Sequence, residues 1–227
     1  MSKILVLGDG KLGSEIVKQS KWFYISRQKD DFDFRYIHSY AGYLKNYDTI
    51  INTIANTESY SPDRESMRDV NYKAVVDLAD YCEATHKKLV HIGTDFSIAN
   101  SEQPATEDVI PMPANNWYSY YKTLADEHIL MRMNNCLVLR GSFKSNPFPY
   151  PNAFTNVEGN FLYVNEFAKL VIELTKKGAT GLYNVGSKNP YTMYEFALKT
   201  NPGVNPICDW IDDSMPESVV MDTSKMW

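Results

Sequence analysis

A glycine-rich turn near the N-terminus constrains this chain more than any other feature of its sequence. The apolar run 4–7 leads into Gly8-Asp9-Gly10-Lys11-Leu12-Gly13, after which apolar residues take a helical spacing. A strand that passes through G-x-G-x-x-G into a helix is typical of sites for a dinucleotide pyrophosphate. The glycines permit a tight turn, a close approach of the ligand and close packing of helix on strand. The alternative is an ordinary glycine turn. The cofactor contacts predicted here are Gly8, Gly10, Lys11, Leu12 and Gly13.

Apolar strands alternate with amphipathic helices along most of the chain. Strands are predicted at 22–25, 49–54, 88–92, 136–139 and 181–185, and helices at 67–82, 117–133 and 164–176. Such alternation predicts βαβ units and a parallel sheet that helices cover on both faces. The predicted fold is therefore α/β, a Rossmann-like doubly wound parallel sheet. Sheets of this kind bind ligands beyond the carboxyl ends of their strands.

Composition excludes several other classes of protein. The 227 residues are 44% hydrophobic and 22% charged, which is ordinary for a globular protein and unlike a disordered one. The net charge of -5, without a basic stripe, argues against nucleic acid as a partner. No apolar run approaches the ~20 residues of a membrane span, and the N-terminus does not resemble a signal peptide, so we expect a cytoplasmic protein without a membrane partner. Three cysteines without a C-x-x-C pair, and histidines without ligand spacing, predict reduced thiols and no metal site.

The end of the second predicted strand bears on the choice of cofactor. NAD-binding folds usually place an acidic residue there, about 20 residues after the glycine motif begins, to hold the ribose 2′-hydroxyl. This chain has Ser26 and Arg27 at that point. A hydroxyl and a guanidinium suit a 2′-phosphate, so NADP is predicted, with NAD as the alternative. Arg27 as a solvated surface residue is the competing interpretation, and Asp30, Asp31 or Asp33 could serve a ribose if the strand runs longer.

A tyrosine and a lysine four residues apart, Tyr118 and Lys122, open the predicted helix over 117–133. This spacing places both side chains on one helix face. An ammonium beside a phenol favours the phenolate, so we expect Lys122 to lower the pKa of Tyr118 from about 10. Such a tyrosine can act as general acid toward a carbonyl oxygen. Thr94, after the strand over 88–92, could supply a third polar group, or could simply cap a turn or helix. Asp95 is expected to have a structural role in that turn.

These motifs, in this order, resemble the extended short-chain dehydrogenase/reductase superfamily, and within it the dTDP-4-dehydrorhamnose reductases. The segment DTIINTIANTE at 48–58 resembles that family's DVVINAAAYT, and Val70-Asn71 matches its VN. LVHIGTDF at 89–96 resembles LVHISTDYVF, and YSYYK at 118–122 stands where the family has YGxTK. Further along, LVLRGSF, GLYNVG and MDTSK resemble LRTSW, GIYHVAG and LDTSK. The resemblance covers nearly the whole chain.

The resemblance implies a site and a reaction. Its catalytic residues would be Thr94, Tyr118 and Lys122. The implied enzyme is an NADP-dependent reductase of the C4 carbonyl of a nucleotide-linked 4-keto-6-deoxy sugar. Tyr118 would supply the proton, Thr94 would polarise the carbonyl oxygen, and Lys122 would hold the nicotinamide ribose and tune Tyr118. The small-molecule partner would be the nucleotide-sugar, and a homodimer is compatible with such folds. Beyond the glycine turn, the implied cofactor contacts are Thr53, Ile54, Ala55, Asn71, Tyr118 and Lys122, and the implied substrate contacts are Thr57, Thr94 and Phe143.

The C-terminal part departs from the family pattern. Arg140 and Val164 are close in sequence, where relatives have a longer segment with a helix that helps to cover the nucleotide-sugar, and the proline-rich stretch 144–155 predicts a loop. The glycine motif is one residue shorter than the family's GxxGxxG, and Phe143 stands where the family has tryptophan. We therefore predict a dinucleotide-binding domain over 1–142. The remaining 143–227 would be a mixed region that returns to the sheet at about 160–185 and forms a reduced, shortened substrate-binding part.

Two other functions are compatible with the sequence. A nucleotide-sugar epimerase of the same superfamily would hold its cofactor tightly and release no oxidised product. A dehydratase is disfavoured, because Phe96 stands where dehydratase relatives carry an acid after Thr-Asp. A non-catalytic, NADP-binding regulatory subunit is favoured by the shortened substrate region, whereas the three filled catalytic positions favour an enzyme.

Overall fold

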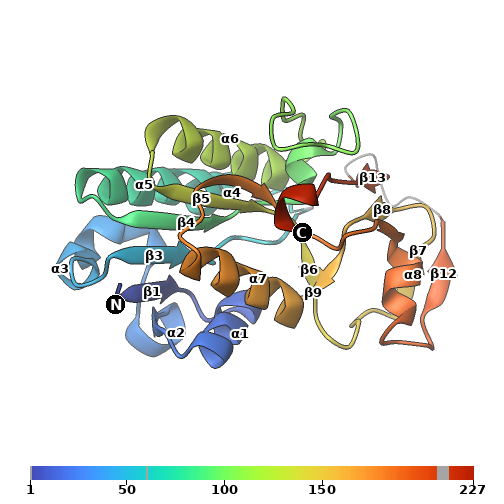
Figure 1. Cartoon of the computed structure of the whole chain (residues 1–227), viewed down its shortest axis with the longest axis horizontal. Helices are drawn as coiled ribbons and strands as arrows, with labels where there is room; N and C mark the ends of the chain where they lie inside the picture. Colours follow the sequence, from blue (N-terminus) through green and yellow to red (C-terminus); the bar gives the residue numbers. More distant parts are fainter. Residues whose placement is uncertain (1, 60, 209–214) are drawn as a thin grey trace.

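A six-stranded parallel sheet forms the centre of the computed structural model, which describes residues 2–59, 61–208 and 215–227 (Figure 1). Its strands are β1 (Ile4–Leu7), β2 (Phe23–Ile25), β3 (Thr49–Asn52), β4 (Lys88–Ile92), β5 (Cys136–Arg140) and β10 (Gly181–Asn184). They lie in the order β10-β5-β4-β3-β1-β2, and every pairing is parallel. The chain leaves β1 for β2 on one side and returns with β3 on the other, so the order reverses at β1. The predicted Rossmann-like, doubly wound fold is confirmed.

Helices cover both faces of this sheet. The helices α1 (Lys11–Ser20) and α7 (Val164–Lys176) pack together on one face, and α5 (Ala74–Ala84) and α6 (Trp117–Arg132) lie on the other (Figure 1). A short helix α4 (Arg64–Arg68) runs into α5 through a π-helical turn, Asp69–Lys73. Within the described ranges, none of the helices combines the length and the apolar character that a membrane crossing requires.

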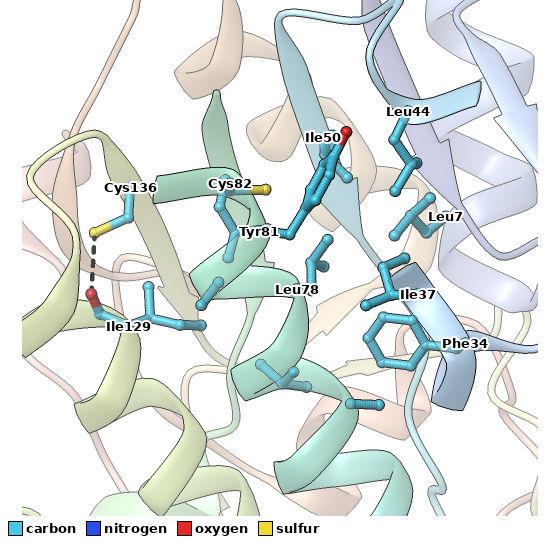
Figure 2. Close-up of a cluster of buried hydrophobic side chains, with 14 of the residues drawn as sticks. Leu7, Phe34, Ile37, Leu44, Ile50, Leu78, Tyr81, Cys82, Ile129 and Cys136 are labelled. Atoms are coloured by element: carbon cyan, nitrogen blue, oxygen red, sulfur yellow. Dashed lines mark hydrogen bonds between the residues drawn. The ribbon is translucent and has the colours of Figure 1, made fainter. Parts of the chain in front are cut away.

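The core consists of two apolar layers because the central strands are buried on both sides. In β1, Leu5 and Leu7 face the α5 and α6 layer, whereas Val6 faces the α1 and α7 layer. This division follows from the two-residue period of a strand. Figure 2 shows the first layer, where Leu7 and Ile50 from the sheet approach Leu78 of α5. All of these side chains are less than 1% exposed, so each contributes roughly 1.5–3 kcal/mol of burial free energy.

Short helical pieces connect β2 to β3, a stretch for which the sequence predicted no structure. They are α2 (Arg27–Asp30), the 3-10 helix Phe34–Tyr40 and α3 (Ala41–Leu44). Phe34 and Ile37 of the 3-10 helix are buried against the α5 layer, as Figure 2 shows. These elements are too short to show the periodicity by which longer helices are predicted.

The C-terminal region adds small sheets at one end of the molecule (Figure 1). They join β6 (Phe143–Lys144) to β9 (Leu162–Tyr163), β7 (Asn152–Phe154) to β12 (Asn205–Ile207), and β8 (Glu158–Gly159) to β11 (Tyr191–Thr192) and β13 (Ser218–Val219). The helix α8 (Met193–Leu198) packs with them over a third apolar cluster, and the chain ends with the 3-10 helix Ser224–Met226. The proline-rich stretch forms no helix, as predicted. The domain boundary at residue 142 stays a prediction.

Candidate functional site

A cleft of about 880 Å³ lies beyond the carboxyl ends of four neighbouring strands. One segment after each strand lines it: 10–12 after β1, 53–55 with 57–59 after β3, 92–96 at β4, and 141–145 after β5. Tyr118 and Lys122 of α6 complete the wall together with Ser61, Pro149 and Tyr150. The position agrees with the rule that doubly wound sheets bind ligands at the switch in strand order. Residues predicted from distant parts of the sequence therefore share one cleft.

The three glycines of the turn have three different environments. Gly8 has a φ of +93°, a conformation that side chains disfavour, and it makes the tight turn. A Cβ on Gly13 would overlap the carbonyl oxygen of Gly8, so this glycine allows α1 to pack on the end of β1. A Cβ on Gly10 would meet no atom within 4 Å, which leaves open space at the cleft wall. Gly8 and Gly13 therefore shape the turn, and Gly10 leaves room for a ligand to approach the backbone and the start of α1.

The loop after β3 is fixed by side chains rather than by regular structure. Thr53 donates its hydroxyl hydrogen to the Leu7 carbonyl (2.7 Å), which ties this loop to the end of β1. The amide of Asn71 accepts from the Asn56 N–H (2.8 Å) and donates to the Asn56 carbonyl (2.9 Å) and to the Met67 sulfur (3.4 Å). Asn71 is 1% exposed and does not line the cleft. The direct cofactor contact expected for Asn71 is thus replaced by a role in holding the 53–57 loop, whereas Thr57 lines the cleft.

Ser26 and Arg27 differ in their availability to a ligand. Ser26 is fully buried, and its hydroxyl accepts from the Lys29 N–H (3.2 Å) as the N-cap of α2. The expected contact between Ser26 and a 2′-phosphate is not supported, because the helix uses that hydroxyl. Arg27 is exposed at the first position of α2. Asp30 accepts from the Ser26 N–H (3.0 Å) and Asp33 pairs with Arg35 (2.6 Å), so these two carboxylates have protein partners.

Thr94 and Tyr118 both line the cleft, where Thr94 is near enough to oppose the rise in the pKa of Tyr118. Thr94 is 3% exposed and accepts from the Phe96 N–H (3.3 Å), so it caps the 3-10 helix Asp95–Ile98. The pKa of Tyr118 is raised to about 12, mainly by burial and also by the charges of Asp95 and Asp126, while Thr94 opposes the rise. The expectation that Lys122 lowers the pKa of Tyr118 is therefore wrong for this structure.

The side chain of Lys122 points to β4, which explains why Lys122 does not lower the pKa of Tyr118. Its side-chain nitrogen lies 3.0 Å from Nε2 of His91 and donates a hydrogen bond to the carbonyl of Ile92. The side chain is 2% exposed, and burial lowers the pKa of Lys122, although Asp126 opposes this. The lysine lines the cleft, but its amine is bound to the strand beneath.

His91, Asn52 and Asp126 are the part of the site that the sequence did not reveal. Nδ1 of His91 lies 3.1 Å from the Asn52 amide nitrogen, and Nε2 lies 3.5 Å from the Asp126 carboxylate. Burial raises the pKa of Asp126 to about 6, and a Cβ on Gly93 would lie 2.6 Å from this carboxylate. Gly93 therefore makes room for the charge. A histidine inside an apolar strand, and an aspartate one turn after Lys122, are the signals that could have predicted this group.

Asp95 and Phe143 also line the cleft. Asp95 accepts from the Ser142 hydroxyl (2.6 Å), which links the turn after β4 to the segment after β5 and fits its expected structural role. Burial raises the pKa of Asp95, and the bond from Ser142 opposes the rise. Phe143 lines the cleft and packs on Phe167, with ring centroids 5.3 Å apart. In the described part of the chain, no three metal-ligating side chains gather into a metal site.

Comparisons with known proteins agree with this geometry. A family model described as the RmlD substrate binding domain matches residues 2–145. No curated protein sequence matches the chain. Among solved structures, the chain is similar to a dTDP-4-dehydrorhamnose reductase from Bacillus anthracis in complex with NADP. The two share 16% identity over 100% of this chain and 91% of that one, with a TM-score of 0.83.

Two further structures show the same fold. A dTDP-4-dehydrorhamnose reductase from Clostridium acetobutylicum is 18% identical over 98% of this chain and 90% of that one, with a TM-score of 0.85. The enzyme WbmG from Bordetella bronchiseptica, in complex with NAD and UDP, is 16% identical over 99% of this chain and 86% of that one, with a TM-score of 0.78.

Proposed function

Because this chain belongs to the RmlD substrate binding domain family, we propose that it is an NADP-dependent reductase acting on the C4 carbonyl of a nucleotide-linked 4-keto-6-deoxy sugar. The observation that carries the proposal is that Thr94, Tyr118 and Lys122 line the same cleft as the glycine turn. The NADP in the Bacillus anthracis reductase supports the cofactor, with NAD as the alternative that the WbmG complex represents. The UDP in that complex supports a nucleotide-linked substrate.

The cleft fits a dinucleotide on three grounds. The glycine turn leaves open space at Gly10, the first turn of α1 offers N–H groups without intrahelical acceptors, and the 53–55 segment is fixed beside it. The residues that would hold the cofactor are Gly10, Lys11, Leu12, Thr53, Ile54 and Ala55, with Arg27 toward the 2′-phosphate. When bound, NADPH supplies the hydride for the reduction.

Tyr118 would donate the proton that the reduced carbonyl oxygen requires. Its raised pKa keeps the phenol protonated at neutral pH, so the hydroxyl has a proton to give. The Thr94 hydroxyl lies in the same cleft and would donate to the same substrate oxygen as negative charge develops on it. Lys122 would hold the nicotinamide ribose after leaving its contact with His91.

The test is NADPH oxidation at 340 nm with a dTDP- or UDP-linked 4-keto-6-deoxyhexose. We expect turnover by the wild type, and Tyr118→Phe should reduce kcat by about 10²–10⁴ because the proton donor is lost. Tyr120→Phe is the matched control, since Tyr120 lies on the same helix, is 44% exposed and does not line the cleft. Equal rates in wild type and Tyr118→Phe would remove Tyr118 from the mechanism. Isomerised sugar without NADPH consumption would indicate an epimerase, and binding of NADPH without any turnover would indicate a regulatory subunit.

A further inference from the structure

Two lysines without a close acidic partner line the cleft from opposite ends of the sequence. Lys11 is the first residue of α1, and Lys144 is the last residue of β6. Among the described residues, neither ammonium group makes a hydrogen bond or comes within 4.0 Å of a carboxylate, whereas the hydroxyl groups of Ser142 and Thr53 in the same cleft are hydrogen-bonded. The sequence motifs already predicted Lys11 as a cofactor contact, whereas Lys144 had no expected function.

The backbone holds Lys144 in place. β6 pairs in parallel with β9, with Lys144 opposite Tyr163, and Tyr163 is the N-cap residue of α7. The Tyr163 N–H is in turn bound by Glu166 of α7 (2.8 Å). The position of Lys144 therefore depends on a helix that packs on α1, the helix that begins at Lys11.

The two positive charges interact with each other. Lys144 is partly buried; burial lowers its pKa, and the charge of Lys11 lowers it further, while Asp95 opposes both effects. Asp95 is already bound to the Ser142 hydroxyl and does not reach Lys144 as an ion pair. A partly desolvated ammonium beside a second ammonium is unfavourable unless an anion lies close to both. The cleft has the space for such an anion, since Gly10 presents no side chain next to Lys11.

We propose that Lys11 and Lys144 together bind the diphosphate group of a ligand in this cleft, and that the shortened C-terminal region contributes Lys144 for this purpose. The inference rests on the proposed function, in which both the cofactor and the nucleotide-sugar carry a diphosphate. Ammonium groups bind phosphate oxygens through charge-assisted hydrogen bonds, which are stronger than neutral ones. The shared chemistry is the diphosphate, and the two sources are distinguished by the ligands used in the test.

The experiment is isothermal titration of the whole chain with ADP-ribose, which has the cofactor's diphosphate without its nicotinamide ring, and separately with UDP. Lys144→Gln and Lys11→Gln should each weaken binding of at least one ligand by about tenfold or more. Lys144→Arg should restore most of the affinity because it restores the charge. Lys177→Gln is the matched control, since it removes an exposed charge at the end of α7. Equal thermal unfolding midpoints would show that the variants are folded.

Each outcome decides the inference. Weaker binding of ADP-ribose alone assigns the two lysines to the cofactor, and weaker binding of UDP alone assigns them to the substrate. Unchanged affinity for both ligands in Lys144→Gln overturns the inference while the proposed function stands. Lysine-dependent binding in a protein that reduces no 4-keto sugar would keep the inference and reject the proposed reaction. A wild-type protein that binds neither ligand would overturn both.

Discussion

The side-chain nitrogen of Lys122 lies 3.0 Å from Nε2 of His91, and this contact determines which atoms of the pair carry protons. The Asn52 carbonyl oxygen accepts from the Ile54 N–H (3.0 Å), so the Asn52 amide nitrogen must be the group that faces Nδ1 of His91. Nδ1 therefore accepts a hydrogen bond. Burial holds the pKa of His91 well below its usual value, so the ring is neutral and its proton is on Nε2. An Nε2–H group cannot accept a hydrogen bond, so Lys122 donates to the Ile92 carbonyl and not to the ring.

The first prediction concerns this tautomer. Long-range 1H–15N NMR spectra at pH 7 should show His91 protonated at Nε2 and unprotonated at Nδ1. Asn52→Leu removes the donor to Nδ1 and should weaken the preference, because the other described contacts of the ring, from Lys122 and Asp126, are made at Nε2. A wild-type spectrum with the proton on Nδ1 would contradict the proposed arrangement of the Asn52 amide and the lysine amine.

The second prediction is a pH dependence of stability that originates at Asp126. Its pKa rises from 3.8 in the unfolded chain to about 6 in the fold because the carboxylate is buried. Between these values the folded protein binds more protons than the unfolded chain does. The contribution of Asp126 is therefore fully present below pH 4 and is lost as the pH rises through about 6. The loss is on the order of 2–3 kcal/mol in the free energy of unfolding.

Urea unfolding of wild type and Asp126→Asn between pH 5 and pH 8 measures this effect. The variant cannot ionise at this position, so its stability relative to wild type should increase as the pH rises. Carboxylates with a lowered pKa, such as Asp33 and Asp69, change stability with pH in the opposite direction. Their contributions are the same in both proteins and cancel in the comparison. Parallel stability curves would show that Asp126 does not titrate in this range.

The third prediction separates two glycines of the same turn. In Gly13→Ala the new methyl group would overlap the Gly8 carbonyl oxygen and lie 2.7 Å from the Thr53 hydroxyl, so we expect a loss of about 2 kcal/mol or more in the free energy of unfolding. In Gly10→Ala the methyl meets no atom and the backbone φ of -62° suits alanine, so stability should change by less than about 1 kcal/mol.

Among the folded variants, NADPH binding should be weakened more by Gly10→Ala than by Gly13→Ala, which is the opposite of their order in stability. The Gly10→Ala methyl would occupy the open cleft wall, so NADPH fluorescence titration should give a weaker affinity than for wild type. Normal NADPH binding by Gly10→Ala would mean that the ligand does not approach the backbone at this glycine, and would place the cofactor elsewhere in the cleft.

The fourth prediction concerns the choice between NADP and NAD. Arg27 is exposed at the start of α2, where a guanidinium can reach a 2′-phosphate, whereas Ser26 is buried under the same helix. Arg27→Ala should weaken NADPH binding by about tenfold and leave NADH binding nearly unchanged. Lys18→Ala removes an exposed charge from α1 and serves as the control. An equal loss for both cofactors would assign Arg27 to a general electrostatic role.

The sequence predicted the parts of this molecule that have a strong local pattern. The strands at 4–7 and 88–92 and the helix at 164–176 have the predicted bounds, because an apolar run closed by glycine and a regular helical repeat depend on short-range order. The glycine turn was predictable for the same reason. The positions of Thr94, Tyr118 and Lys122 in one cleft followed from the resemblance and from the rule on strand ends.

The rest depended on contacts between distant residues. The direction of Lys122 is set by His91, which is 31 positions away, and the pKa of Tyr118 follows from burial that a pattern of residue types does not express. Ser26 and Asn71 have the polar groups that a ligand would need, but a helix N-terminus and the Asn56 backbone use those groups first. A polar residue at the right position is thus not sufficient evidence for a ligand contact when the fold itself has unpaired backbone groups nearby.

The packing of α7 on α1 has a consequence for how this protein can be divided. Phe167, Val171 and Ile172 of α7 cover the apolar surface formed by Val6, Leu12 and Ile16, and β10 pairs with the outer side of β5. A fragment cut after Ser145 would contain the whole glycine turn together with Thr94, Tyr118 and Lys122. It would nevertheless expose one apolar face of its sheet to water and leave β5 as an unpaired edge strand. Both features promote aggregation. The parts of the chain before and after Ser145 must therefore be produced and engineered together.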